Sequence, residues 1–384
     1  MQSEKRAINP MPSVRLTMSE AALYQERIGR LQDEMIQSGV DLTLIAPTAN
    51  MRYLTGFAPM MDERFCALMV SPNGFKMVVP DLNADQVETH TGLTVMRWKD
   101  EQGPFDSISS AISQLAVPPN IVLAADNSMR AEHLLMVQDK TNPERSLPAG
   151  DLMSALRIIK SQDEIDKLAR SAALADRAMQ AGIDACIPGT TERRVANQIS
   201  NFFYENGAEK VDFTLVASGP NGAFPHHQSG DRTLETGDPI ILDIGATLAG
   251  YKSDITRMVF LGDPTREFGA VYQAVLDANQ AGRTAAVPGN TAADVDRAAR
   301  ASLKNNHLDE YFVHRTGHGL GLEGHEPPWM TSTSETVLSP GMVFSVEPGV
   351  YLPGKFGVRI EDILVVTEGD PLLLTGFDHN FVAK

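Results

Sequence analysis

The feature that most restricts what this chain can fold into is a pair of aspartates in otherwise apolar sequence. Asp243 interrupts a predicted strand that begins Pro239-Ile-Ile-Leu, and Asp254 follows eleven residues later. A carboxylate in such a strand is costly to bury unless it is paired or binds a metal. A hairpin centred between residues 248 and 249 would place the two aspartates directly opposite each other, about 5 Å apart at Cβ. Like charges at that separation repel unless a cation lies between them.

A second pair of carboxylates repeats this arrangement downstream. Glu347 and Glu361 each lie seven residues from Gly354, and Pro353-Gly354 is a turn signal. A hairpin centred on this turn would again bring two carboxylates face to face. Pro348 predicts that the first strand of this hairpin is an edge strand or is interrupted there.

Both pairs also have an interpretation that needs no metal. Asp254 could cap a turn or pair with Arg257, and Asp243 would then merely end a strand. Glu361 could form a surface ion pair with Arg359, and the other glutamate would be an exposed residue before a turn.

Three histidines, His314, His318 and His325, lie within twelve residues among glycines at positions 317, 319, 321 and 324. The glycines argue against a helix and favour a loop or strand that closely approaches another segment. Their pattern matches neither the dinucleotide-binding nor the P-loop motif.

Two aspartates, two glutamates and one histidine would together provide mostly oxygen ligands. Their formal charge is −4 with a neutral imidazole, which two divalent ions would balance. This predicts a dinuclear site with ions about 3.5–4 Å apart. The donor set favours manganese and is compatible with cobalt, iron or zinc.

Composition narrows the class of protein. The chain has 384 residues, is 42% hydrophobic and carries a formal charge of −16, so disorder throughout and binding to nucleic acid or an anionic membrane are disfavoured. Its two cysteines, Cys66 and Cys186, form no CxxC motif and are expected to be buried free thiols. No apolar run approaches 18 residues, and the charged, proline-containing N-terminus does not resemble a signal peptide. We therefore expect a cytoplasmic protein.

The first part of the chain is predicted to be an α/β domain over residues 1–155. A helix is expected over 20–38, capped by Ser19 and ended by Gly39, and four short apolar runs indicate a mostly parallel or mixed sheet. The polar stretch 140–150 is interpreted as the approach to a domain boundary.

The second domain, 156–384, is predicted to begin with a long helix because Ser161 and Glu164 have the spacing of a capping box. Helix patterns near 162–183, 191–206, 266–283 and 291–306 come in pairs, and each pair precedes antiparallel-looking strands. This order suggests an internal duplication of one α/β unit, which gives an α/β (α+β) class.

The carboxylate and histidine motifs resemble the metal-ligand set of the pita-bread metallopeptidases, family M24. The matching motifs are the two aspartates eleven apart, His318 in Gly-His-Gly, Glu347 in Glu-Pro-Gly and Glu361 in Gly-Val-Arg-Ile-Glu-Asp. Segments 50–57, 156–165 and 219–226 resemble the proline-specific branch, which contains Xaa-Pro dipeptidase (prolidase) and aminopeptidase P. The resemblance runs from about residue 20 to 375. It implies a creatinase-like N-terminal domain that narrows the pocket and dimerises. It also implies a pita-bread catalytic domain with pseudo-twofold α/β repeats and a curved antiparallel sheet.

The same resemblance implies a role for each ligand. Asp243 and Asp254 would bind one metal, with Asp254 bridging to the second ion. His318 would complete the second site, Glu347 would assist it, and Glu361 would bridge. Glu347 would also accept the proton of the attacking water.

Further residues are carried over from the family pattern. His226 and His325 would face the substrate and donate hydrogen bonds to a developing oxyanion or to the substrate carboxylate. His314 would lie near the pocket. Arg359 would steady Glu361 from outside the ligand set. His227 is expected to point away from the pocket and is given no role.

The implied function is metal-dependent hydrolysis of the Xaa-Pro bond of dipeptides or short peptides by a hydroxide that two metal ions activate, in a cytoplasmic homodimer. Prolidase is slightly favoured over aminopeptidase. One alternative is a metal-dependent lyase or non-peptide amidohydrolase on the same fold. A dimethylsulfoniopropionate lyase of this kind has an additional aspartate near the first one, whereas this chain has glycine at position 245. Creatinase-like and ectoine-hydrolase-like relatives, and an inactive binding homologue, would be expected to lack some of the ligands.

Overall fold

The computed structural model describes residues 20–384, which fall into two compact units. The first unit ends at Leu156, and the second covers Arg157–Lys384. Ser19, the expected cap of the first helix, lies outside the described residues. None of the helices within 20–384 combines the length and hydrophobicity that crossing a bilayer requires. Cys66 and Cys186 are both buried free thiols, as expected.

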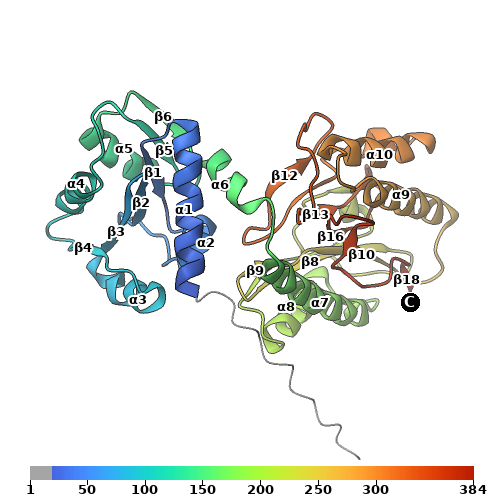
Figure 1. Cartoon of the computed structure of the whole chain (residues 1–384). Coiled ribbons are helices and arrows are strands. Elements are labelled where there is room, and N and C mark those ends of the chain that lie inside the picture. The colour runs from blue at the N-terminus through green and yellow to red at the C-terminus, as the bar shows by residue number, and fades with distance from the viewer. Residues whose placement is uncertain (1–19) are drawn as a thin grey trace, which may run out of the picture. The chain divides into compact units, whose positions relative to one another are not determined.

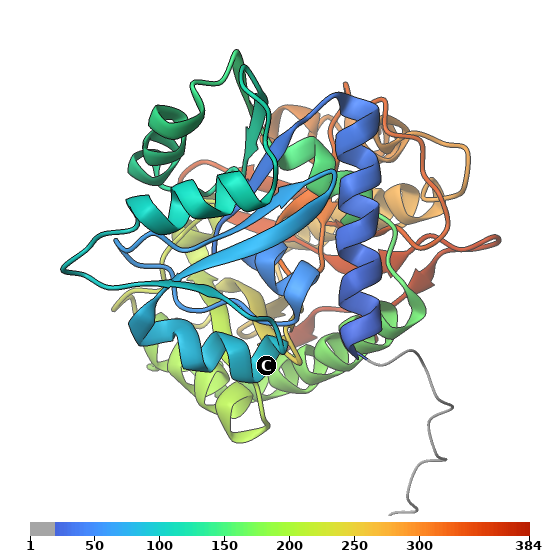
Figure 2. The ribbon, with the colours of Figure 1, turned by 60° about the vertical axis from the view of Figure 1, so that its left-hand side comes forward.

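The first unit is a six-stranded mixed sheet with helices packed around it (Figure 1 and Figure 2). The strand order is β4-β3-β2-β1-β5-β6, in which β1, β2 and β3 run antiparallel and the remaining pairs are parallel. The strands are β1 (Leu42–Ile45), β2 (Ala67–Ser71), β3 (Gly74–Pro80), β4 (Met96–Trp98), β5 (Val122–Ala125) and β6 (Arg145–Pro148). The helices are α1 (Glu20–Ser38), α2 (Ala49–Thr55), α3 (Asp81–Thr91), α4 (Phe105–Gln114), α5 (Ala131–Thr141) and α6 (Gly150–Arg157). The expectation of a mixed sheet is confirmed.

One segment of this unit differs from its interpretation as a linker. The polar stretch 140–150 contains the edge strand β6, which pairs in parallel with β5. Three of the four residues of β6 are exposed. Because an exposed edge strand carries polar side chains, its sequence looks like that of a linker.

The second unit repeats one arrangement twice: two helices followed by antiparallel strands (Figure 1). The first half contains α7 (Gln162–Ala185), α8 (Glu192–Glu205), β7 (Lys210–Ser218), a short 3₁₀ turn η1 (Gly219–Ala223), β8 (Pro239–Leu248), β9 (Tyr251–Lys252) and β10 (Ile255–Phe260). The second half contains α9 (Arg266–Thr284), α10 (Ala292–Asn305), η2 (Asp309–Tyr311), β11 (Gly317–Gly319), β12 (Glu326–Met330), β13 (Val343–Val346), β14 (Gly349–Leu352), β15 (Phe356–Arg359), β16 (Asp362–Val365), β17 (Leu372–Leu373) and β18 (Val382–Ala383). The capping box at Ser161 is present, as expected.

Backbone hydrogen bonds confirm the suspected duplication. The loop between α7 and α8, Ile187-Pro-Gly-Thr-Thr191, is matched by Val287-Pro-Gly-Asn-Thr291 between α9 and α10. In the first loop Gly189 N–H donates to Leu234 and Leu234 N–H donates to Thr190. In the second half, Gly289 N–H donates to the carbonyl of Leu338, and Leu338 N–H donates to the carbonyl of Asn290. The two halves therefore share one local structure despite low sequence similarity.

The strands of the first half lie between the two pairs of helices (Figure 1). Alternate residues of β8, such as Ile240 and Leu242, belong to the apolar core under α7 and α8. Ile241 belongs instead to the core beside α9. Since side chains alternate along a strand, Asp243 points toward the face that the second half covers.

Candidate metal centre

The first predicted hairpin forms, but its register differs from the expected one. Strands β8 and β9 turn through Ala249 and Gly250, which both have positive φ angles of 51° and 80°. Asp243 consequently pairs with Thr256, not with Asp254, so the direct pairing of the two aspartates was wrong. The reason is that a two-residue turn of this kind centres the hairpin one residue later. Asp254 lies on the same face as Thr256 and is therefore a diagonal neighbour of Asp243.

Gly245 leaves no room for a further carboxylate beside Asp243. A Cβ at this position would lie 2.4 Å from the carbonyl oxygen of Ser253 and 2.6 Å from the ring of Phe213. The additional aspartate that characterises the lyase alternative would collide with the backbone here.

The second predicted hairpin has the expected register. The strand pairs that flank the two glutamates fix this register: Gly349 pairs with Arg359, and Val346 pairs with Asp362. Glu347 and Glu361 therefore face each other between two ladders, and the strand is interrupted at Pro348 as expected.

Glu361 also joins the second hairpin to the first. Its backbone N–H donates to the carbonyl of Thr256 at 3.3 Å, and the Thr256 hydroxyl donates to Glu361 Oε2 at 2.8 Å. Because Thr256 pairs with Asp243, this contact brings the carboxylates of both hairpins into one place.

His318 lies in the short strand β11, which the flanking glycines allow to sit very close to its neighbours. A Cβ on Gly317 would lie 1.8 Å from the carbonyl oxygen of Ser345. The His318 Nδ1 is 3.1 Å from its neighbour's carbonyl, which fixes the proton on Nδ1. Its Nε2 faces Glu347 Oε1 at 3.2 Å and Asp254 Oδ2 at 3.9 Å, so this nitrogen points at the carboxylates and would be the one that binds a cation.

All five predicted ligands line one cavity of about 910 Å³. Their donor atoms form overlapping groups in which every atom lies within 4.8 Å of the others: Asp243, Asp254 and Glu361; His318, Glu347 and Glu361; and Asp254, His318 and His325. Glu361 belongs to both carboxylate-rich groups, which is the arrangement expected of a bridging ligand. The buried Asp243 Oδ1 has no hydrogen-bond partner among the described residues. A buried oxygen without a partner is costly, and a cation would satisfy it.

The pKa values of these carboxylates diverge. Burial, followed by the charges of Glu361 and Asp243, raises the pKa of Asp254 well above its usual value. Burial and the neighbouring carboxylates also raise the pKa of Glu361. Burial acts on Glu347 in the same direction, but the hydrogen bond and charge of His318 outweigh it and lower its pKa to about 2. The donor set is thus a crowded anionic site, which fits divalent cations.

Arg359 does not lie where we expected it. Its guanidinium donates to Asp243 Oδ2 at 2.5 Å instead of contacting Glu361. It reaches Glu361 only through the Thr256 hydroxyl, to which it donates at 3.2 Å. The long Arg359 side chain extends to β8, where its positive charge partly neutralises the candidate ligand Asp243. Tyr351, which the sequence did not single out, accepts a 2.8 Å hydrogen bond from Arg359.

The three candidate catalytic histidines also line the cavity. His226 sits in a turn after η1 and not on a strand. His227 also lines the cavity, contrary to the expectation that it points away, and its Nε2 contacts Glu192 at 2.7 Å. The ring of His325 lies against that of His318, with ring centroids 3.9 Å apart and the two planes tilted by 41°. Loss of surrounding water, followed by the charge of His318, lowers the pKa of His325 to about 4. Both nitrogens of His314 are engaged within the protein, Nε2 with Tyr351 at 2.8 Å and Nδ1 with a backbone carbonyl.

Comparison with known proteins identifies the family. Residues 166–368 match metallopeptidase family M24, and residues 27–159 match the creatinase/prolidase N-terminal domain. The chain belongs to metallopeptidase family M24. The expected creatinase-like and pita-bread parts are thereby confirmed.

Relatives of this M24 metallopeptidase extend over nearly the whole chain. The probable dipeptidase PepE of Mycobacterium tuberculosis is 37% identical over 369 residues, which cover 94% of this chain and 97% of that protein. The Xaa-Pro dipeptidase of Pyrococcus furiosus is 34% identical over 352 residues, covering 91% and 98%. A solved prolidase structure from Thermococcus sibiricus has a TM-score of 0.89 at 36% identity and covers 94% of this chain and 99% of that one.

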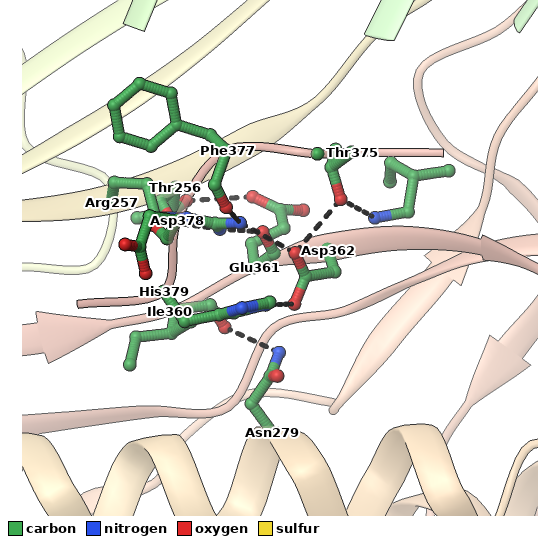
Figure 3. Close-up of polar contacts among 12 residues, drawn as sticks. Thr256, Arg257, Asn279, Ile360, Glu361, Asp362, Thr375, Phe377, Asp378 and His379 are labelled. Atoms are coloured by element: carbon green, nitrogen blue, oxygen red, sulfur yellow. Dashed lines mark hydrogen bonds and ion pairs between the residues drawn. The ribbon is translucent and has the colours of Figure 1, made fainter. Parts of the chain in front are cut away.

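Behind Glu361, this M24 metallopeptidase has a buried polar network (Figure 3). Arg257 donates to the carbonyl of Glu361 at 2.6 Å and to Asp362 Oδ1 at 2.8 Å. It also donates to the carbonyls of Phe377 and Asp378, at 2.8 and 2.9 Å. The network thus ties the backbone of a candidate ligand to the C-terminal segment.

Glu192, which the sequence analysis did not identify, holds the segment that carries His226. Its side chain is fully buried and accepts five hydrogen bonds, from the N–H and hydroxyl of Ser218, Asn221 Nδ2, His227 Nε2 and the N–H of Gly230. Burial alone would raise the pKa of Glu192, but the hydrogen bonds from these donors have the larger effect, so the pKa lies below its usual value. A single glutamate at the start of a helix gives no sequence signal for this role, because an acidic residue is common there.

Glu192→Gln is expected to lower the free energy of unfolding by about 1–3 kcal/mol. The NH₂ group of the new amide would face N–H groups, from which it cannot accept hydrogen bonds. Urea denaturation measures the loss. Glu205→Gln on the same helix is the control: Glu205 is exposed, and the change should stay within about 0.5 kcal/mol. Equal losses in the two variants would contradict the prediction.

Proposed function

We propose that this M24 metallopeptidase hydrolyses the Xaa-Pro bond of dipeptides or short peptides with the help of two divalent metal ions. The observation that carries the proposal is the pair of donor groups that share Glu361 in one cavity. The names of the relatives from Pyrococcus furiosus and Thermococcus sibiricus support the substrate class.

The ligand assignment follows the two donor groups. Asp243 and Asp254 would hold one ion and His318 and Glu347 the other, with Glu361 between them. The Nδ1 contact of His318 supports this assignment because it leaves the Nε2 lone pair available. Manganese is our preferred metal for an oxygen-rich set with one imidazole.

When bound, divalent ions supply Lewis acidity and lower the pKa of water toward neutrality. Glu347 is ionised at neutral pH and is proposed to accept the proton of the attacking water at its carboxylate. The Arg315 guanidinium is 3.3 Å from His325 Nδ1 and can only donate, so the proton of a neutral His325 sits on Nε2. His325 and His226 are proposed to donate hydrogen bonds to the oxygen of the carbonyl under attack.

His314 is proposed to act through Tyr351, not on the substrate. Its two nitrogens are already hydrogen-bonded, and Tyr351 also contacts Arg359, which in turn holds Asp243. This chain of contacts would position a ligand.

The homodimer and the roles expected for residues 1–155 stay predictions, and light scattering of the purified protein tests the dimer.

A substrate panel tests the proposed reaction. With Mn²⁺, Ala-Pro and Gly-Pro should be hydrolysed, and a chelator should reduce the rate at least ~10²-fold because the ions supply several kcal/mol of transition-state stabilisation. Ala-Ala is the control for proline specificity, and dimethylsulfoniopropionate tests the lyase alternative. Release of acrylate or dimethyl sulfide without dipeptide hydrolysis would overturn the proposal.

A further inference from the structure

Glu347 and Glu361 face each other at a point where their hairpin lacks one of its backbone hydrogen bonds. Ile360 N–H donates to the carbonyl of Pro348 at 3.4 Å. In a regular antiparallel pair the reciprocal bond would run from the N–H of residue 348 to the carbonyl of Ile360, but proline has no N–H. Ile360 is fully buried, so its carbonyl needs a donor from outside the hairpin.

The side chain of Asn279, on helix α9, supplies this donor (Figure 3). Its Nδ2 donates to the carbonyl of Ile360 at 3.3 Å and to the carbonyl of Val346 at 2.9 Å. These two carbonyls belong to the peptide groups that directly precede Glu361 and Glu347. One amide group therefore holds both strands at the positions from which the glutamate side chains leave the backbone.

The amide of Asn279 is kept at a cost. The residue is fully buried, and its Oδ1 has no hydrogen-bond partner among the described residues. Turning the amide round would not relieve this cost, because Oδ1 would then face two carbonyl oxygens. Since a buried oxygen without a partner is unfavourable, an apolar side chain would suit this core position better. The two N–H groups, and not packing, therefore explain why an asparagine is present.

The duplication of the second unit provides an internal comparison. When the two helix–helix loops are aligned, Ala178-Met-Gln-Ala-Gly182 of α7 matches Ala278-Asn-Gln-Ala-Gly282 of α9, and the two segments differ at one position. Met179 is fully buried in the core that α7 and α8 form with β8, which is a continuous strand. The half with a continuous strand thus has an apolar side chain here, and the half that Pro348 interrupts has an amide.

Gly282 lets α9 approach the hairpin closely. A Cβ on this glycine would lie 2.8 Å from Val346 Cγ1. Gly282 follows Asn279 by three residues, so the two lie on the same face of the helix. The close approach allows the short side chain of asparagine to reach both carbonyls directly.

We propose that Asn279 is a positioning residue that sets the separation of the Glu347 and Glu361 carboxylates and thereby the affinity of the site for divalent ions. The inference rests on the proposed function, in which both glutamates bind metal. Without the two N–H groups, the peptide groups before the glutamates could tilt, and each carboxylate would move with its peptide group. Partners behind a metal ligand commonly control metal affinity in this way.

The test replaces Asn279 with methionine, the residue found in the other half. Asn279→Met should weaken the binding of Mn²⁺ to the chelator-treated protein by about 10–10²-fold for at least one ion, as measured by isothermal titration calorimetry. At saturating Mn²⁺, kcat for Ala-Pro should fall by about 10-fold or more, while KM changes less than about threefold. KM should be little affected because Asn279 does not line the cavity. If Asn279→Met does not fold, Asn279→Ala removes the same donors without adding volume.

Asn290→Met is the matched control. Asn290 Nδ2 also donates to a backbone carbonyl, that of Ala285 at 2.9 Å, but this contact lies in the loop between α9 and α10. A variant whose effect is only on stability should lower Tm and leave Mn²⁺ affinity and kcat within about threefold of wild type, which is the result expected for Asn290→Met.

The inference is overturned if the Asn279 variant binds Mn²⁺ and hydrolyses Ala-Pro as wild type does, or if the Asn290 control loses as much affinity. Failure of the wild-type protein to bind Mn²⁺ or to hydrolyse Ala-Pro would instead overturn the proposed function.

Discussion

Asp254→Asn should nearly abolish Xaa-Pro hydrolysis while it makes the metal-free protein more stable. Asp254 contributes donor atoms to two of the three candidate metal-binding groups, so the amide should weaken metal binding. We expect kcat/KM for Ala-Pro to fall by about 10²–10⁴-fold, within the range that metal-assisted catalysis supplies. Elemental analysis should show fewer bound manganese ions per chain.

The gain in stability has a defined pH dependence. Burial and neighbouring carboxylates raise the pKa of Asp254 in the folded protein above its value in the unfolded chain. The ionised side chain therefore costs no stability below the unfolded pKa of about 4, and it costs most above the folded pKa. The Tm difference between the variant and wild type, both with chelator, should grow from pH 5 to pH 8. At pH 8 it should reach about 2 °C or more, since 1 kcal/mol shifts Tm by about that amount in a unit of this size.

Asp263→Asn is the control for this prediction, because Asp263 is exposed and lies outside the candidate site. It should change neither the rate nor the Tm measurably. If Asp254→Asn retained activity near wild type, the ligand assignment would be wrong. If it destabilised the metal-free protein, burial of a charged Asp254 among other carboxylates would not be what raises the pKa of this side chain.

Arg257→Met should destabilise the second unit by about 3–5 kcal/mol, because it removes the arginine nearest to the buried Asp362 carboxylate and leaves only Arg283, 3.8 Å away, and His379 beside it. The arginine is 1% exposed and makes five hydrogen bonds, none of which methionine can replace. Burial raises the pKa of Asp362, but the His379 hydrogen bond and the Arg257 charge outweigh it and hold the pKa well below its usual range. The contribution of Asp362 is therefore present above pH ~4 and is lost as acid protonates it. Urea denaturation at pH 7 and pH 3 measures the difference, which should shrink at pH 3 because the loss occurs below pH ~4.

Two further variants make this result specific. Arg297→Met removes an exposed arginine from a surface pair and should cost no more than about 1 kcal/mol. The double variant Arg257→Met/Asp362→Leu should be less destabilised than the sum of its two single changes, because the buried arginine and the carboxylate it pairs with are then removed together. Additive losses would show that the ion pair is not what stabilises the segment behind Glu361.

The spacing of the carboxylates was enough to predict both hairpins of the candidate site. The turn at Gly354 gave the register of Glu347 and Glu361 correctly, since a Pro-Gly turn fixes the centre of a hairpin. The same reasoning failed by one residue for Asp243, because Ala249 and Gly250 adopt left-handed backbone conformations that the residue types alone did not reveal. The polar edge strand β6 was missed for a related reason: exposed strand residues resemble loop residues.

What the sequence determined by itself was the chemistry: which carboxylates and which imidazole could bind a cation, and on which hairpins they lie. These follow from local rules, since strand alternation and turn residues act over a few positions. Only the tertiary structure decided that Thr256 joins the two hairpins, that Arg359 pairs with Asp243, and that Glu192 and Arg257 support the site. The contacts of Thr256, Arg359 and Arg257 each join positions more than a hundred residues apart, so they arise only when the two halves of the second unit pack together. The Glu192 contacts lie within the first half but join α8 to the segment after β7, which no local pattern records.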